Sequence, residues 1–354
     1  MKKKMIFSLF AGVAISVTAL YFAFKNVPFS ELIEYFQSID YFWMFVSLLF
    51  VGLSFYMRAL RWQVILRTAS RISFWRAYHP MMIGFMLNCI LPARIGELAR
   101  PAILQQKEKV PFTTGLATVA TERLFDLLFL ILLFAVVLSV VDIDPNIEMS
   151  FGSYTLNRTT LLNIGSGMVK LSLILIFGIA LISIDRFRKL IRLVIMKIPG
   201  LFSFAGAGTQ DTIGKYFSLP MVSIMENIAA GFGLVKDVKN LALCLFFSLT
   251  IWLLQAVSYY IITLGCPGIN ISLFEATVVL IIICFFIALP SVPGFWGLWE
   301  AGAVFALSLF AIGAKEASGF ALVSHAIQMF PVIIAGFISA IIYGVNIRQI
   351  QYNS

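Results

Sequence analysis

Polar side chains suited to holding an anion follow an apolar run in the first third of the chain. From Asn88 to Arg100 the sequence reads Asn-Cys-Ile-Leu-Pro-Ala-Arg-Ile-Gly-Glu-Leu-Ala-Arg. Pro92 can begin a helix. On that helix Arg94, Glu97 and Arg100 would share one face at i, i+3 and i+6. Two guanidinium groups can grip a phosphate or carboxylate, while Glu97 orients one of them or carries a proton. The alternative is an ion-paired cap that closes a hairpin.

A second group of charges lies near the start of a long apolar run. Glu122 and Asp126 are one helical turn apart, and Arg123 lies beside them. Charge in an apolar segment is costly, so such residues mark a functional site by default. These three are therefore candidates for a functional site. The alternative is an internal Arg123–Asp126 pair that serves only structure.

A third group surrounds a break in the apolar pattern at residues 290–300, which read Pro-Ser-Val-Pro-Gly-Phe-Trp-Gly-Leu-Trp-Glu. Pro293 and Gly294 open the backbone, and free N–H groups at the start of the next helix can bind an anion. Glu300 is expected in the first turn of that helix. The alternative is an interfacial turn anchored by the two tryptophans, with Glu300 serving the helix dipole.

The last candidate is His325, which lies in the final apolar run with polar neighbours at Ser324 and Gln328. It can carry a proton. The alternative is a packing residue held by hydrogen bonds.

Several familiar catalytic patterns are missing from the sequence. It has no phosphate-binding loop of the ATPase type, no H-E-x-x-H and no G-x-S-x-G. The four cysteines are far apart and form no C-x-x-C pair. We therefore expect no metal ion, no cofactor and no catalytic residue, and we do not expect an enzyme.

Composition places these groups in a membrane protein. Of 354 residues, 60% are apolar and 12% are charged, and the mean hydropathy is +0.96. Soluble domains have about 45–50% apolar and about 25% charged residues. This excludes a cytosolic enzyme, a disordered chain, a collagen and a disulfide-stapled module. The net charge of +9 is expected in cytoplasmic loops rather than at a nucleic-acid site.

Several apolar runs are long enough to cross a bilayer, which takes about 20 residues. The first is expected to be an uncleaved helix, because it is longer than the apolar core of a signal peptide. Two further apolar pieces, 78–91 and 295–312, are shorter. The longer runs are Met5–Phe24, Tyr41–Met57, Thr113–Val141, Gly167–Ile184, Leu241–Leu264, Ser272–Leu289 and Ser318–Val345.

The loop charges indicate the orientation. Residues 58–76 carry five arginines and no acid, and residues 185–239 carry eight basic side chains and four acids. Residues 25–40 and 142–165 are mainly acidic. By the positive-inside rule, both termini are expected in the cytoplasm, with the chain as a multi-pass protein of the cytoplasmic (inner) membrane.

Two segments are expected to be broken helices. Within residues 77–101, the apolar piece 78–91 has basic flanks on both sides and is too short to cross. This predicts a re-entrant hairpin that turns at Leu91-Pro92 and whose second helix ends before Pro101. Residues 272–312, with the broken-helix segment 289–300, are either two short spans or a second hairpin. The two breaks resemble each other, which is consistent with a weak inverted repeat.

The expected architecture is a single all-α transmembrane domain over residues 1–354. It has about eight spans with one or two re-entrant or broken helices. Residues 185–239 are expected to form two amphipathic helices on the cytoplasmic surface.

Three motifs in this order resemble a known family, the flippase-like transmembrane domain of lysylphosphatidylglycerol synthetases. The resemblance covers nearly the whole chain and implies movement of lipid headgroups between leaflets. We expect a stand-alone member that lacks the soluble aminoacyl-transferring domain. The motifs are Asn88-x-x-Leu91-Pro92-Ala93-Arg94-x-Gly96-Glu97-x-x-Arg100, Glu122-Arg123-x-x-Asp126 and Pro290-x-x-Pro293-Gly294-x-x-Gly297-x-x-Glu300.

The expected function is translocation of an anionic phospholipid or a polyprenyl phosphate, with arginines holding the headgroup and carboxylates pairing them or relaying protons. One alternative is a scaffold or accessory subunit of a lipid or glycan biosynthesis enzyme, with that enzyme or a second copy of the chain as partner. Another is a membrane-embedded transferase acting on a lipid phosphate. The residues expected to bind substrate are Asn88, Arg94, Glu97, Arg100, Glu122, Arg123, Asp126, Pro293, Gly294, Glu300 and His325.

Overall fold

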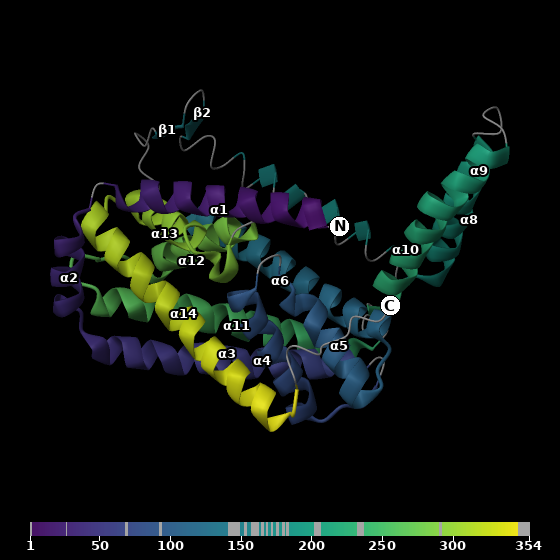
Figure 1. Cartoon of the computed structure of the whole chain (residues 1–354), viewed down its shortest axis with the longest axis horizontal. Coiled ribbons are helices and arrows are strands. Elements are labelled where there is room, and N and C mark those ends of the chain that lie inside the picture. The colour runs from purple at the N-terminus through teal and green to yellow at the C-terminus, as the bar shows by residue number, and fades with distance from the viewer. Residues whose placement is uncertain are drawn as a thin grey trace.

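The computed structural model describes residues 2–25, 27–67, 70–91, 94–140, 149–151, 154–156, 184–201, 207–231, 237–289 and 292–345, with scattered positions between 163 and 181. In this part of the chain every element is helical except one short antiparallel hairpin of two strands (Figure 1). The predicted all-α class is thus confirmed in its main feature. The elements are α1 (Lys2–Phe24), α2 (Phe29–Ser38), α3 (Tyr41–Leu66), α4 (Phe74–Ile90), α5 (Gly96–Glu108), α6 (Phe112–Val140), β1 (Met149–Phe151), β2 (Tyr154–Leu156), α8 (Asp185–Leu201), α9 (Ala207–Ile213), η2 (Gly214–Ser218), α10 (Leu219–Gly231), α11 (Val238–Gly265), α12 (Leu273–Ala288), η4 (Pro293–Phe295), α13 (Leu298–Ser308) and α14 (Ala314–Ile342).

Side-chain caps fix where several helices begin. The carboxylate of Asp40 accepts a hydrogen bond from the N–H of Phe42 at 3.0 Å, and α3 starts there. Ser272 and Glu275 form a reciprocal capping box at the start of α12. Such caps satisfy N–H groups that the first helical turn leaves unpaired.

Among the residues that the structure describes, three helices, α3, α11 and α14, are long and apolar enough to cross a membrane. The bent pair formed by 13–24 of α1 with α2 would make a fourth span. The expected total of about eight spans therefore stays a prediction. The expected span at 167–184 lies largely outside the described residues.

The long α3 corrects one boundary. The predicted span ended at Met57, and residues 58–76 were expected to form a basic loop. Instead α3 continues to Leu66, and Arg61 inside it is fully buried. Arg61, one of the loop arginines from which the orientation was predicted, therefore lies inside the helix bundle. It can do so because carboxylates on α6 neutralise its charge.

A close glycine contact shapes the first broken segment. Helices α4 and α5 pack against each other on either side of the break, and a Cβ added to Gly84 would collide with the Arg100 side chain and the Gly96 carbonyl oxygen. The second helix was expected to end before Pro101. This is wrong, since α5 continues through Pro101 to Glu108. Pro101 is the sixth residue of α5 and lacks one N–H donor there, and the helix continues for seven more residues.

The second broken segment has the same plan. Helices α12 and α13 pack together, with Gly302 against Ile283 and Phe286. Gly294 and Gly297 take positive φ angles of 73° and 88°, where a side chain would be strained. All four helices are shorter than a full span, so both segments have the form of helical hairpins. Their re-entrant placement in a membrane stays a prediction.

Three long helices form the framework around both hairpins. Helices α3 and α11 pack along their lengths, where the Ser47 and Ser258 hydroxyls lie 2.9 Å apart. Helix α14 runs obliquely across the bundle and packs on α4 and α13 (Figure 1). Helix α1 covers the second hairpin, where the Ser16 hydroxyl accepts a hydrogen bond from the N–H of Val292 at 3.3 Å.

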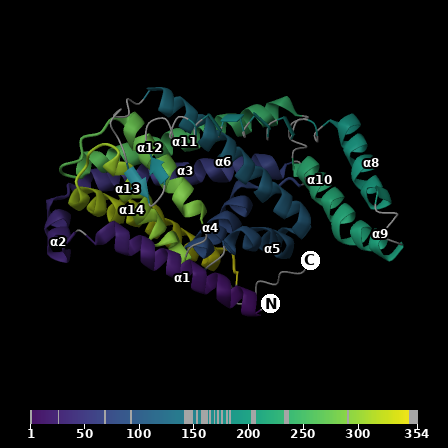
Figure 2. The same ribbon diagram turned by 90° about the horizontal axis from the view of Figure 1, so that it is seen from above.

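Helices α8, α9 and α10 form an arm beside the bundle (Figure 2). The arm contacts the rest of the protein through α10, which packs on α6. Its first helix carries exposed Leu190 and Leu193 together with basic side chains. This agrees with the amphipathic character expected for 185–239, whereas its placement on a membrane surface stays a prediction.

The glycine contact in the first hairpin can be tested by Gly84→Ala. We expect this change to lower stability by about 1–3 kcal/mol, because the added methyl group overpacks a tight helix contact. The matched control is Gly52→Ala in α3, where a Cβ meets nothing within 4 Å. That change is expected to be neutral or slightly stabilising. Thermal unfolding in detergent measures both, and equal melting temperatures for the two variants would contradict the packing argument.

Candidate functional site

A buried carboxylate joins three arginines at the centre of the protein. Glu122 of α6 has no exposed surface. Its Oε2 lies 2.6 Å from Arg100 Nη2, and its Oε1 lies 2.9 Å from Arg123 Nη2 and 3.6 Å from Arg61 Nη2. These arginines come from α5, α6 and α3. Glu122 therefore connects the first hairpin to two long helices.

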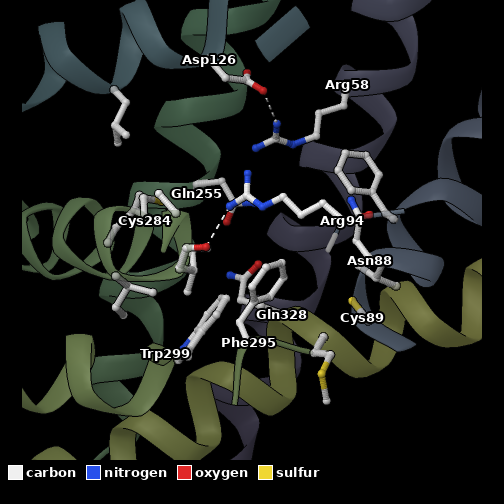
Figure 3. Close-up of a pocket in the computed structure, with 18 of the residues that line it drawn as sticks. Arg58, Asn88, Cys89, Arg94, Asp126, Gln255, Cys284, Phe295, Trp299 and Gln328 are labelled. Atoms are coloured by element: carbon white, nitrogen blue, oxygen red, sulfur yellow. Dashed lines mark hydrogen bonds and ion pairs between the residues drawn. The ribbon is translucent and has the colours of Figure 1, made fainter. Parts of the chain in front are cut away.

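A second carboxylate, Asp126, extends this network to the wall of a cavity. Asp126 Oδ1 lies 2.7 Å from Arg61 Nη2, and Asp126 Oδ2 lies 3.2 Å from Arg123 Nη2 and 3.5 Å from Arg58 Nη1 (Figure 3). The predicted Arg123–Asp126 pair is thus present, as part of a larger network.

Two of the arginines are held too tightly to be free for a ligand. Arg61 Nη1 donates to the Ser248 hydroxyl at 2.9 Å in addition to its carboxylate contacts. The Arg100 guanidinium lies over the Trp62 ring, 4.0 Å from its centroid. Both side chains are almost fully buried. Arg61 and Arg100 are therefore the fixed part of the network.

Beside this charged network lies a cavity of about 500 Å³. Its walls come from both hairpins and from α3, α6, α11 and α14 (Figure 3). Most of the lining is apolar or aromatic. The charged lining residues are Arg58, Arg94, Glu97, Arg123 and Asp126.

Arg94 connects the two hairpins across the cavity. It follows the first break, and its Nη2 donates to the carbonyl oxygen of Ile287 at the end of α12, at 2.8 Å (Figure 3). Its guanidinium also lies 5.7 Å from the Phe295 ring centroid. In addition, a Cβ added to Gly294 would contact the carbonyl oxygen of Cys89. The break points of the two hairpins therefore meet at one place.

The expected shared face of Arg94, Glu97 and Arg100 is wrong. Arg94 has a φ of 52° and lies outside the helix, which begins at Gly96. Glu97 lines the cavity, whereas Arg100 turns into the buried network. Helical spacing does not relate the two arginines because the backbone between them is not continuously helical.

Positive charge exceeds negative charge at this site. In the network and the cavity lining that the structure describes, five arginines accompany three carboxylates, Glu97, Glu122 and Asp126, a net charge of +2. Coulombic interactions are strong where water is scarce. The site therefore favours an anion.

Polar atoms on the cavity wall lack protein partners. Among the described atoms, Asn88 Oδ1, Trp252 Nε1 and Gln255 Oε1 are buried without a hydrogen bond. Buried polar atoms are usually satisfied, and unpaired ones are costly. A polar ligand or water in the cavity would satisfy them.

A buried acid–histidine pair lies where the second hairpin meets α14. His325 Nδ1 lies 2.6 Å from Glu300 Oε1, and His325 Nε2 lies 2.7 Å from the carbonyl oxygen of Gly294. Glu300 Oε2 accepts the N–H of Gly297 at 2.7 Å. Glu300 is in the first turn of α13, as expected. The Gly297 N–H expected to be available for an anion is thus already occupied by Glu300.

The sequence identified most of this site but missed part of it. The structure places Asn88, Arg94, Glu97, Arg123, Asp126 and His325 on the cavity wall, Arg100 and Glu122 in the buried network, and Pro293, Gly294 and Glu300 in the second hairpin. The missed residues are Arg58 and Arg61. Their i, i+3 spacing, followed by a mostly apolar stretch up to Leu66, was the available signal.

Two comparisons with known proteins give significant matches, and no solved structure matches the chain significantly. The model of a family described as lysylphosphatidylglycerol synthase TM region matches residues 9–336. A protein named glycosyltransferase AglD, from Haloferax volcanii, is 24% identical over 355 residues. That match covers 93% of this chain and 53% of the relative, so the chain spans about half the length of the curated relative.

The buried network can be tested by Glu122→Gln. Loss of this charge leaves buried arginines without compensation, and we expect a loss of about 3–5 kcal/mol of stability. The matched control is Glu226→Gln, because Glu226 also faces two arginines, Arg188 and Arg192, but is partly exposed. An exposed pair contributes at most about 1 kcal/mol. Unfolding in detergent compares the two variants, and a similar small change in both would contradict a stabilising role for the buried network.

Proposed function

This chain belongs to the lysylphosphatidylglycerol synthase TM-region family, and we propose that it moves an anionic phospholipid or a polyprenyl phosphate between the leaflets of a membrane. The family and the apolar long helices make it a membrane protein with a lipid-related function. The translocation activity, the inner membrane, the cytoplasmic termini and the absence of catalysis are parts of the proposal.

The cavity with its excess of arginines is the observation that carries the proposal. Charge inside a bilayer costs several kcal/mol, even on lenient scales. A phosphate that crosses must therefore meet compensating charge and hydrogen-bond donors on its way. Guanidinium groups supply both, since their N–H groups match phosphate oxygens in pairs. Arg58, Arg94 and Arg123 line the cavity and are the residues assigned to the phosphate.

The size of the cavity fits a headgroup rather than a whole lipid. Binding sites for small molecules have volumes of about 300–1,000 Å³, and this cavity holds about 500 Å³. The proposed path therefore takes the headgroup through the protein, while the acyl chains stay in the surrounding lipid.

The carboxylates have a different role in this proposal. Glu97 and Asp126 line the same cavity and compete with the ligand for the arginines. This competition keeps the phosphate from binding irreversibly. Arg61 and Arg100 hold Glu122 in place and are positioning residues.

The proposal predicts that Arg94→Gln slows lipid movement about tenfold or more. The change removes a charged hydrogen-bond donor, which is worth about 1.5–3 kcal/mol. Purified protein would be reconstituted in vesicles with fluorescent phosphatidylglycerol, and dithionite, which does not cross the bilayer, would report the label that reaches the outer leaflet. Arg58→Gln is a second variant with the same expected effect.

The matched control is Arg67→Gln, because Arg67 is exposed at the end of the helix that carries Arg58. It is expected to move lipid at the wild-type rate. A polyprenyl phosphate assayed in the same vesicles separates the two lipid classes. If wild-type protein moves neither lipid, or if Arg94→Gln and Arg58→Gln match the control, the proposal is wrong.

A role beside a biosynthetic enzyme is the second candidate. It is favoured by the match to about half of a relative that is named a glycosyltransferase. In this case the chain would act with an enzyme that builds a lipid-linked product. Mass spectrometry of lipids in cells lacking the chain distinguishes the two functions: a missing product supports the second, and an unchanged set of lipids with altered leaflet distribution supports translocation.

A further inference from the structure

The hydrogen bonds of His325 determine how many protons the acid–histidine pair holds. Nε2 of the ring lies 2.7 Å from the carbonyl oxygen of Gly294, and a carbonyl oxygen can only accept. Nε2 therefore carries a hydrogen. Nδ1 lies 2.6 Å from Glu300 Oε1, and this contact also needs a hydrogen. Either the histidine is a cation beside a carboxylate, or a neutral histidine accepts from a protonated Glu300.

Both arrangements contain one proton that a neutral histidine beside an ionised glutamate lacks. Without that proton, Nδ1 and Oε1 would face each other as two acceptors in a buried place, since Glu300 and His325 are 0% and 1% exposed. Such a contact is repulsive and costs free energy. The observed geometry thus belongs to the protonated pair.

This pair holds the turn of the second hairpin in place. His325 binds the carbonyl of Gly294, and Glu300 binds the N–H of Gly297, so the two ends of the turn are tied to α14. The Trp299 ring stacks on His325 at 4.7 Å, with an angle of 6° between the planes. Phe295 of the same turn lines the cavity and packs beside Arg94. Movement of the turn would change the wall of the cavity.

We propose that Glu300 and His325 form a proton-dependent latch, which closes the Pro293–Gly294 turn when the pair is protonated and releases it when the proton leaves. The inference rests on the proposed function in one respect: it makes a proton gradient the energy source of lipid movement. His325 lines the cavity, so the proton leaves to water there. An anion bound in the cavity stabilises the protonated pair by charge attraction, which links proton binding to lipid binding.

Other titratable groups line the same cavity and could also respond to a change of pH. Glu300 is the titratable side chain in hydrogen-bond contact with His325 among the described residues. The remaining titratable or charged groups line the cavity from six other elements and from Arg94, which precedes α5. They are Arg58 on α3, Cys89 on α4, Arg94 and Glu97 at the start of α5, Arg123 and Asp126 on α6, Tyr259 on α11 and Cys284 on α12.

Glu300→Gln tests the latch with little change in shape. The amide oxygen of glutamine can accept from the N–H of Gly297, and the amide NH₂ can donate to Nδ1 of a neutral His325. All three hydrogen bonds are then kept, but the shared proton is gone. The matched control is Glu275→Gln, because Glu275 caps α12 as Glu300 caps α13 and pairs with Ser272 rather than with a histidine.

The first measurement is hydrogen–deuterium exchange of the backbone at residues 292–299, in nanodiscs, between about pH 5.5 and 8, where histidine titrates. In wild type and in Glu275→Gln, exchange is expected to rise with pH several-fold beyond the intrinsic chemical rate. In Glu300→Gln it is expected to follow the intrinsic rate alone. The same pH response in Glu300→Gln and wild type would overturn the latch.

The second measurement is lipid movement in vesicles, with and without an imposed pH gradient. The ratio of the two rates is expected to exceed one in wild type and Glu275→Gln, and to equal one in Glu300→Gln. Wild-type movement with a ratio of one overturns the gradient as energy source and leaves the proposed function standing. An exchange response that is lost in Glu300→Gln, together with no lipid movement in wild type, supports the latch and overturns the proposed function.

Discussion

The need to neutralise buried arginines constrains the whole centre of this protein. Arg61 and Arg100 come from helices that are far apart in the sequence, and both lie beside Glu122 with almost no exposed surface. An unpaired charge at such a depth costs several kcal/mol. The relative positions of α3, α5 and α6 are therefore coupled. The same arrangement places charged side chains on the wall of the neighbouring cavity.

A second constraint, the need to pair the carbonyl groups at helix ends, explains why the broken helices meet at one point. A short helix that ends inside the bundle exposes carbonyl groups that need donors. Arg94 supplies one by reaching from the first break to Ile287 near the second. Glycines let the partner helices of each hairpin approach closely, at Gly84 and at Gly302. The two breaks thus support each other, and the cavity forms where neither hairpin fills the space.

The sequence indicated which residues could bind an anion, but it did not show which charged residues are buried in helices and which lie in loops. Charged residues in apolar surroundings drew attention to Glu122 and Asp126, and the structure places both in the arginine network. Arg58 and Arg61 were missed because an arginine at the end of an apolar run looks the same in a loop and in a buried helix. Only their partners on α6 distinguish the two, and that contact joins positions more than 60 residues apart. The face assumed for Arg94 failed for a local reason, a left-handed residue that sequence spacing does not reveal.

The two walls of the cavity differ in a way that bears on mechanism. The arginine wall has a fixed charge, since guanidinium groups stay protonated in proteins. By itself it can attract an anion but offers no way to let it go. Asp126 weakens this hold by occupying the same donors, and in the proposed latch the Glu300–His325 pair supplies a charge that changes by one proton. A site that must bind and release the same anion needs both features, a fixed attraction and a variable opposing charge, and the arginines and His325 line one cavity of about 500 Å³.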